Sequence, residues 1–132
     1  MPVKWFAIYL WVNKMRDYIP FIKRNDICKI FIEDIMMIEQ DLRKIVIHTE
    51  EEQHQCYGKI SELSEYLDGR FYKCHCSCII NMDKVVRMKD RMIYFENGFV
   101  MPICREKFQN AKQYFAIYIK KRMQRMEDTI NV

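Results

Sequence analysis

The chain has 132 residues, enough for one domain with its own hydrophobic core. Half of the residues are apolar and 30% are charged, which argues against a disordered chain, and three Gly and three Pro leave no room for a glycine-rich phosphate loop. The net charge of +4 hides a segregation: residues 33–68 hold ten acidic and three basic residues, whereas residues 69–126 hold thirteen basic and four acidic ones. A local basic field attracts a polyanion, although such residues can also simply solvate a surface.

The thiols and the apolar N-terminal run bear on the cellular location. Six cysteines are scattered along the chain without a secretory signal ahead of them, and ten Met accompany them, which suits a reducing compartment. Trp5–Val12 is too short to span a bilayer and lacks a small-residue cleavage site. We therefore expect a cytoplasmic protein with reduced cysteines.

The first half of the chain predicts one helix followed by short strands. Val3–Tyr18 has helical spacing but is apolar on both faces, so it needs a partner: its own domain, a second copy or a membrane surface. Pro20 ends it. Runs rich in β-branched residues, separated by polar turns such as Asp41-Leu42, then predict strands at Ile19–Lys23, Ile27–Ile32, Ile35–Glu39, Lys44–Thr49 and His54–Tyr57.

The second half predicts a short helix, more strands and a final helix. Lys59–Leu67 has amphipathic helical spacing and ends at Asp68-Gly69. Strands are expected at Phe71–Asn81, Val85–Lys89, Met92–Glu96 and Phe99–Ile103, with Asn97-Gly98 as the clearest hairpin turn. A second helix, Arg105–Met126, should bury one face: Phe108, Ala111, Phe115, Tyr118 and Ile119. The chain is thus mainly β, with a short internal helix and a helix at each end.

Phe71–Asn81 reads FYKCHCSCIIN and alternates if it is one extended strand. Phe71, Lys73, His75 and Ser77 would then share one face, opposite Tyr72, Cys74, Cys76 and Cys78. Thiols about 6.5–7 Å apart along a strand favour packing as small hydrophobic groups over zinc chelation. A redox-sensitive thiol beside basic residues is a further alternative.

Several of these segments carry a family resemblance. The motif Phe71-x-x-Cys-His-x-Ser-x-Ile-Ile-Asn81 follows the short helix, and Glu33-Asp34-Ile35-Met36, Lys44–Thr49, Asn97-Gly98 and Ile103–Arg105 stand in matching order. In this order the chain resembles the LytTR-type DNA-binding domain from about Ile19 to Ala116. We therefore expect an N-terminal helix or linker at 1–18, the LytTR-like domain at 19–116, and a basic helix end and tail at 117–132.

The resemblance implies an elongated domain of three antiparallel sheets that acts in bacterial transcription regulators. Members insert side chains from sheet-edge loops into successive major grooves, commonly at paired direct repeats. Most carry a receiver domain ahead of this part, for which this chain has no room, so a phosphorelay input is not expected. A homodimer built through residues 1–18 is one possibility.

By the same resemblance, three places would face DNA. They are the loop with Arg43 and Lys44, the Cys-His-x-Ser edge, and Arg105. Arg offers a bidentate fork to guanine, and Lys or Arg neutralises phosphate. The family usually has Arg or another polar base-reading residue at position 76, whereas Cys76 is a weak donor. We therefore expect the base preference either to be relaxed or to move to Lys73, His75 or Ser77. Arg87 and Lys89, with Arg91 and Lys84, would contact phosphates.

The competing hypothesis is a protein-interaction module with no DNA role, which docks through Val3–Tyr18. Catalysis is not expected, because adjacent Cys74 and His75 on one strand point to opposite faces and no other nucleophile–base pair or cluster of carboxylates is evident. His48 and His54 flank the acidic run Glu50–Glu52, which we interpret as a solvated hairpin end. We expect no enzyme activity, cofactor, metal or small-molecule substrate.

Overall fold

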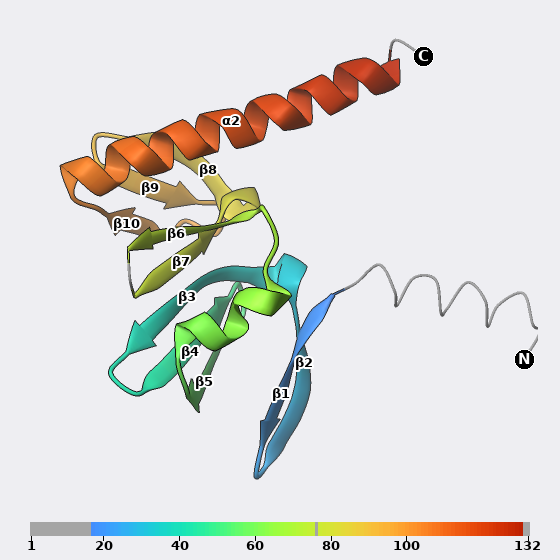
Figure 1. Ribbon diagram of the computed structural model, residues 1–132, viewed down its shortest axis with the longest axis vertical. Coiled ribbons are helices and arrows are strands. Elements are labelled where there is room, and N and C mark those ends of the chain that lie inside the picture. Colours follow the sequence, from blue (N-terminus) through green and yellow to red (C-terminus); the bar gives the residue numbers. More distant parts are fainter. Residues whose placement is uncertain (1–16, 76, 131–132) are drawn as a thin grey trace, which may run out of the picture.

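The computed structural model describes residues 17–75 and 77–130, in which strands form three antiparallel sheets (Figure 1). The prediction of a mainly β fold with three antiparallel sheets is confirmed. Most of the predicted N-terminal helix Val3–Tyr18 lies outside the described residues. Its last residue, Tyr18, instead begins the first strand, β1.

The smallest sheet is a hairpin of β1 (Tyr18–Lys23) and β2 (Asp26–Phe31). The alternation of side chains along the strand decides which face of the hairpin packs on the core, because Ile19 and Phe21 of β1 are buried while their neighbours are exposed. A single 3-10 turn, η1 (Ile32–Asp34), then leads into the next sheet.

The central sheet has five strands in the order β5-β4-β3-β7-β6. Its strands are β3 (Ile35–Asp41), β4 (Lys44–Thr49), β5 (Gln53–Tyr57), β6 (Phe71–His75) and β7 (Cys78–Asn81). The predicted strand Lys44–Thr49 is confirmed to the residue. Both faces of β3 are covered, since Ile35 and Ile38 belong to one hydrophobic cluster and Met36 and Met37 to the other.

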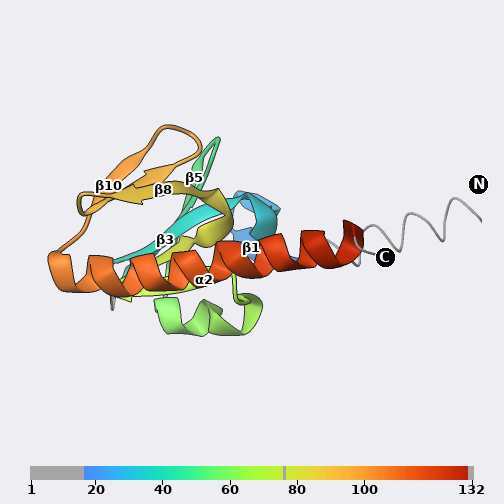
Figure 2. The ribbon, with the colours of Figure 1, turned by 90° about the horizontal axis from the view of Figure 1, so that it is seen from above.

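The third sheet contains β8 (Val85–Lys89), β9 (Met92–Phe95) and β10 (Val100–Pro102). It follows the 3-10 turn η3 (Met82–Lys84). The long helix α2 (Arg105–Ile130) passes alongside this sheet and packs against β6 (Figures 1 and 2).

The buried face of α2 differs in one residue from the predicted face. Phe108 and Ala111 are buried, and Phe115 and Tyr118 pack against the second hydrophobic cluster, as expected. Ile119, however, is 45% exposed, and Tyr114 packs inward with its ring centroid 4.8 Å from that of Tyr72. The prediction for Ile119 was wrong because the apolar face of α2 that packs on the cluster passes through Tyr118, and the next residue, Ile119, is turned toward solvent.

Two predicted elements take a different form. The segment Lys59–Leu67 contains a 3-10 helix, η2 (Ile60–Tyr66), instead of an α-helix, with Leu63 and Leu67 packed on the first cluster. The Phe71–Asn81 stretch is not one strand: it folds back as the hairpin of β6 and β7, so that His75 pairs with Cys78. No helix within the described ranges is both long and apolar enough to cross a bilayer.

Candidate nucleic-acid interface

The β3–β4 turn presents the first pair of predicted DNA contacts. It falls at Leu42–Arg43, one residue later than predicted, and Leu42 adopts a left-handed conformation with φ of 56°. Arg43 and Lys44 are both exposed, and the Lys44 ammonium lies 5.7 Å from the ring centroid of Tyr57. Both side chains are therefore open to solvent, with Lys44 beside the Tyr57 ring.

Gln40 holds this turn in place, a role that the sequence did not reveal. Its side-chain Nε2 lies 3.1 Å from the carbonyl oxygens of Leu42 and Lys44 and 2.9 Å from that of Gly58, to which it donates. Its Oε1 accepts a hydrogen bond of 2.7 Å from the amide of Ile60. One carboxamide thus ties the turn to the segment that leads into η2.

The β6–β7 turn presents the second set of predicted residues. Lys73 and His75 are exposed on β6, and His75 Nδ1 lies 3.2 Å from the backbone nitrogen and 2.8 Å from the hydroxyl oxygen of Ser77. Cys76 lies outside the described residues. The imidazole and the hydroxyl therefore lie within hydrogen-bond distance of each other. On a single strand, alternate residues would have been about 6.5–7 Å apart along one face.

The two turns lie at the same end of the central sheet. Strands β3 and β7 are antiparallel neighbours in which Glu39 pairs with Cys78, and the Gln40 amide donates to the Ser77 carbonyl at 2.8 Å. The end of β3 thus adjoins the start of β7. Arg43 and Lys44 therefore share an edge with His75 and Ser77.

The third set of residues comes from the three-stranded sheet and α2. Arg87 and Lys89 are exposed on β8, and Asp90 and Arg91 form its turn with φ of 54° and 63°, as in a type I′ hairpin. The Ile103 amide donates to the Arg91 carbonyl at 3.0 Å. Exposed Arg105, which begins α2 two residues later, therefore stands beside this turn.

All three loops lie along one side of the molecule, which is the left side in Figure 1 and remains so in Figure 2. The strand directions require this arrangement, because β3, β6 and β10 all run toward that side. The structure therefore gathers residues that are 62 positions apart in sequence, from Arg43 to Arg105, along one edge.

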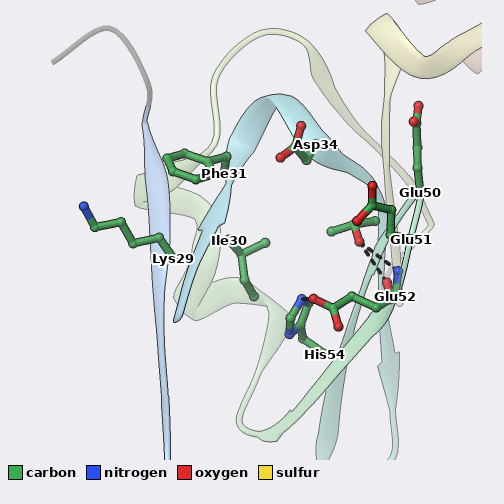
Figure 3. A pocket seen from close by; sticks show the side chains of 9 residues that line it. Lys29, Ile30, Phe31, Asp34, Glu50, Glu51, Glu52 and His54 are labelled. Carbon is green, nitrogen blue, oxygen red and sulfur yellow. Dashed lines mark hydrogen bonds and ion pairs between the residues drawn. The ribbon is translucent and has the colours of Figure 1, made fainter. Parts of the chain in front are cut away.

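A cluster of acidic residues occupies the opposite end of the central sheet. Strand β4 separates Lys44 from Thr49 by about 17 Å, and the β4–β5 turn then carries Glu50, Glu51 and Glu52. A cavity of about 190 Å³ lies there, with the three glutamates on one side and Asp34 of η1 nearby (Figure 3). The central sheet thus carries three glutamates at one end and Arg43 and Lys44, next to Asp41, at the other.

The two histidines of this region have acidic partners. His54 Nε2 lies 3.2 Å from a carboxylate oxygen of Glu52, and His48 Nε2 lies 3.0 Å from one of Glu39. His54 is buried, and its ring contacts that of Phe21 at a centroid distance of 5.1 Å. Both histidines therefore have structural partners within the fold.

Lys84, one of the suggested phosphate contacts, is already paired. Its ammonium lies 3.0 Å from Glu96 and 3.3 Å from Glu50. Burial alone would lower the pKa of Lys84, but hydrogen bonds to the two carboxylates outweigh it and raise the pKa. Lys84 thus joins η3 to two other segments, in contrast to exposed Arg87 and Lys89.

The comparison with protein families decides the classification. The model of the LytTr DNA-binding domain matches residues 25–116, which is most of the chain. The chain belongs to the LytTR family. That family is defined as a DNA-binding domain and not as a class of enzymes.

Relatives of this LytTR domain include regulators from staphylococci. It is 36% identical over 70 residues to accessory gene regulator protein A of Staphylococcus epidermidis and 35% identical over 69 residues to that of Staphylococcus aureus. These matches cover 50% and 49% of this chain and 29% of each relative, so the chain spans less than a third of their length.

A solved structure has the same fold. It is the LytTr DNA-binding domain of a Bacillus cereus methyl-accepting/DNA response regulator, with a TM-score of 0.62 and 15% identity. The similarity covers 74% of this chain and 95% of that one. The predicted LytTR fold is confirmed.

Proposed function

We propose that this LytTR domain binds double-stranded DNA in a sequence-specific manner and acts in bacterial transcription regulation. The observation that carries the proposal is the position of its exposed cations. Arg43 and Lys44, Lys73, and Arg105 with Arg87 and Lys89 lie in or beside loops at one edge, while the acidic β4–β5 turn lies at the other end of the sheet. A polyanion is attracted to the first edge and repelled from the second.

Each loop has a different chemical task in this proposal. The Arg43 and Arg105 guanidinium groups read guanine O6 and N7 in successive major grooves, because their planar forks match those two acceptors. His75 and Ser77 supply adaptable donors and acceptors at the middle loop, where position 76 is a cysteine. Lys44, Lys73, Arg87 and Lys89 neutralise phosphates and set the register without reading sequence.

The finer features remain part of the proposal. They are paired direct-repeat sites, a homodimer, a cytoplasmic location, and the division of the chain into 1–18, 19–116 and 117–132. The two staphylococcal relatives are named as gene regulators, which supports a role in transcription. The exposed cations of the β3–β4 and β8–β9 turns, with Lys73 on β6 between them, support contact with a long duplex in preference to a short ligand.

A DNA-selection experiment tests the proposal. Purified protein is incubated with a randomised duplex library at two salt concentrations, and the bound sequences are read. Enrichment of a short motif at both salts supports sequence-specific reading, and a fixed spacing between two motif copies gives the site arrangement. Binding without enrichment would contradict base reading, and no binding at either salt would refute the DNA function of the isolated chain and favour docking through Val3–Tyr18.

A charge-matched pair of variants identifies the binding edge. Lys89→Ala and Lys29→Ala each remove one exposed lysine, but Lys29 lines the acidic cavity on the other side of the fold. We expect only Lys89→Ala to weaken DNA binding, because Lys29 is remote from the three loops. Equal losses would show that binding depends on net charge alone.

A further inference from the structure

The β6–β7 hairpin brings three metal-ligating side chains together. One donor atom each of Cys74, His75 and Cys78 lies within 4.8 Å of the other two. On one extended strand, as the alternation of the sequence predicts, the thiols would be too far apart to share a metal. The hairpin removes that objection, because Cys74 and Cys78 stand on facing strands and His75 pairs directly with Cys78.

We propose that Cys74, His75 and Cys78 form a site for a thiophilic divalent cation such as Zn²⁺. Around a tetrahedral zinc, bond lengths of about 2.0–2.3 Å place neighbouring donors about 3.3–3.8 Å apart. The present separations exceed this by no more than about 1.5 Å. Rotation of the three side chains and a small adjustment of the two paired strands would close the site.

The local sequence and backbone suit such a site. Cys74 and Cys78 have the Cys-x₃-Cys spacing of a zinc knuckle, in which both thiols come from a tight turn. A register shift between Lys73 and His75 lets consecutive residues turn their donors toward the same point, which regular alternation forbids. The bulge thus explains why His75 joins the two thiols.

The donor set selects the class of metal. Two sulfurs and one imidazole favour Zn²⁺ over Mg²⁺ or Ca²⁺, which prefer oxygen ligands. Binding displaces one proton from each thiol to solvent, and the two thiolates then neutralise the dication. One coordination position is left for water or another donor. Cys76 lies outside the described residues and is not included in the site.

Another group of donors within the described residues, Asp26, Cys28 and His54, also lies within 4.8 Å. It has one thiol instead of two, and its imidazole forms an ion pair with Glu52. The His75 imidazole also has partners, since its Nδ1 accepts from the Ser77 amide and lies 2.8 Å from the Ser77 hydroxyl, so the number of thiols decides between the two groups. In the β6–β7 group, the Cys74 thiol lies 3.5 Å from the Cys78 carbonyl, a weak hydrogen bond that a metal can replace. The hairpin is therefore the better site.

The proposal does not rest on DNA binding and is tested without DNA. The full chain, purified without a polyhistidine tag and kept reduced, is titrated with Co²⁺ while thiolate-to-cobalt charge-transfer absorption is followed. Zn²⁺ is then added to displace Co²⁺, and the bound metal is counted. We expect one metal ion per chain, with the cobalt spectrum of a tetrahedral site containing two thiolates.

Two variants assign the site. His75→Gln removes an exposed ligand with no loss of core packing. It should weaken Co²⁺ binding tenfold or more, because changes even at residues that only support a ligand lower metal affinity about 10–100-fold. Cys78→Ser should abolish the charge-transfer band, although Cys78 is buried and the variant needs a circular-dichroism check of its fold. If it does not fold, His75→Gln alone decides.

Two cysteine variants serve as controls. Cys104 is exposed and separate from both donor groups, so Cys104→Ser should bind Co²⁺ as the parent chain does. Cys28→Ser tests the competing group. Unchanged binding in His75→Gln, loss in Cys28→Ser alone, or no binding by the folded parent chain would each overturn the assignment.

Discussion

Replacement of Asn81 by Ala gives the sharpest test of how this fold is held together. Asn81 ends the FYKCHCSCIIN segment, is fully buried, and joins two segments that are far apart in sequence. Its Nδ2 donates to the Ile35 carbonyl at 2.7 Å, and its Oδ1 accepts from the Asp83 amide at 3.0 Å. The second bond caps η3.

The expected cost follows from these two bonds. Each is worth about 1 kcal/mol net, and a buried group left without a partner costs about 1–3 kcal/mol. The Ile35 residue is fully buried, so water cannot easily replace the lost donor, whereas the Asp83 amide is only partly buried. We expect Asn81→Ala to lower the free energy of unfolding by about 3 kcal/mol.

The chain offers a matched control. Asn97 also accepts a hydrogen bond from the amide two residues ahead, Phe99, at 3.0 Å, but in an exposed turn. Asn97→Ala should therefore cost less than about 1 kcal/mol. Urea unfolding followed by far-ultraviolet circular dichroism measures both variants, and equal losses would refute the argument that burial makes the Asn81 bonds costly.

Three further predictions concern DNA binding. Arg105→Ala should cost about 1–3 kcal/mol on a selected site and little on random duplex; an equal loss on both would make Arg105 a phosphate contact. Lys89→Ala should weaken binding uniformly and lower the salt slope by about one unit, and an unchanged slope would contradict this. Gln40→Ala should reduce the free energy of unfolding by about 1–2 kcal/mol, because the Ile60 amide loses its partner. It should also weaken specific DNA binding, and wild-type affinity would show that the Arg43 turn keeps its conformation without Gln40.

The strands were predictable wherever burial imposes a pattern on adjacent residues. Lys44–Thr49 and Val85–Lys89 match to the residue, because Ile45-Val46-Ile47 and Val85-Val86 are β-branched and lie between polar turns. The family motif supplied the three-sheet arrangement. Periodicity alone would not have shown that the Arg43 turn and the His75 turn share an edge, since that depends on β3 pairing with β7.

The β6–β7 hairpin was missed for a physical reason. Its reversal falls between His75 and Cys78, where the sequence has none of the Gly, Asn-Gly or Pro signals that mark tight turns. The chain reverses there because Ile79 and Ile80 extend the sheet on both of its buried faces. Such a turn is imposed by tertiary packing and not by local preference.

Gln40 escaped prediction for a different reason, and its position explains how the interface is organised. Its side chain fixes the β3–β4 turn, while its main-chain amide donates to Ser77 of the β6–β7 turn. Because one residue anchors both loops, their separation is set by the pairing of β3 with β7 and not by the flexibility of either loop. Arg105 belongs to a separate sheet and helix, so its distance from the other two depends on how α2 packs against β6. Two of the three proposed contacts therefore form one hydrogen-bonded unit, and the third is placed by the hydrophobic cluster that α2 and the three-stranded sheet share with the central sheet.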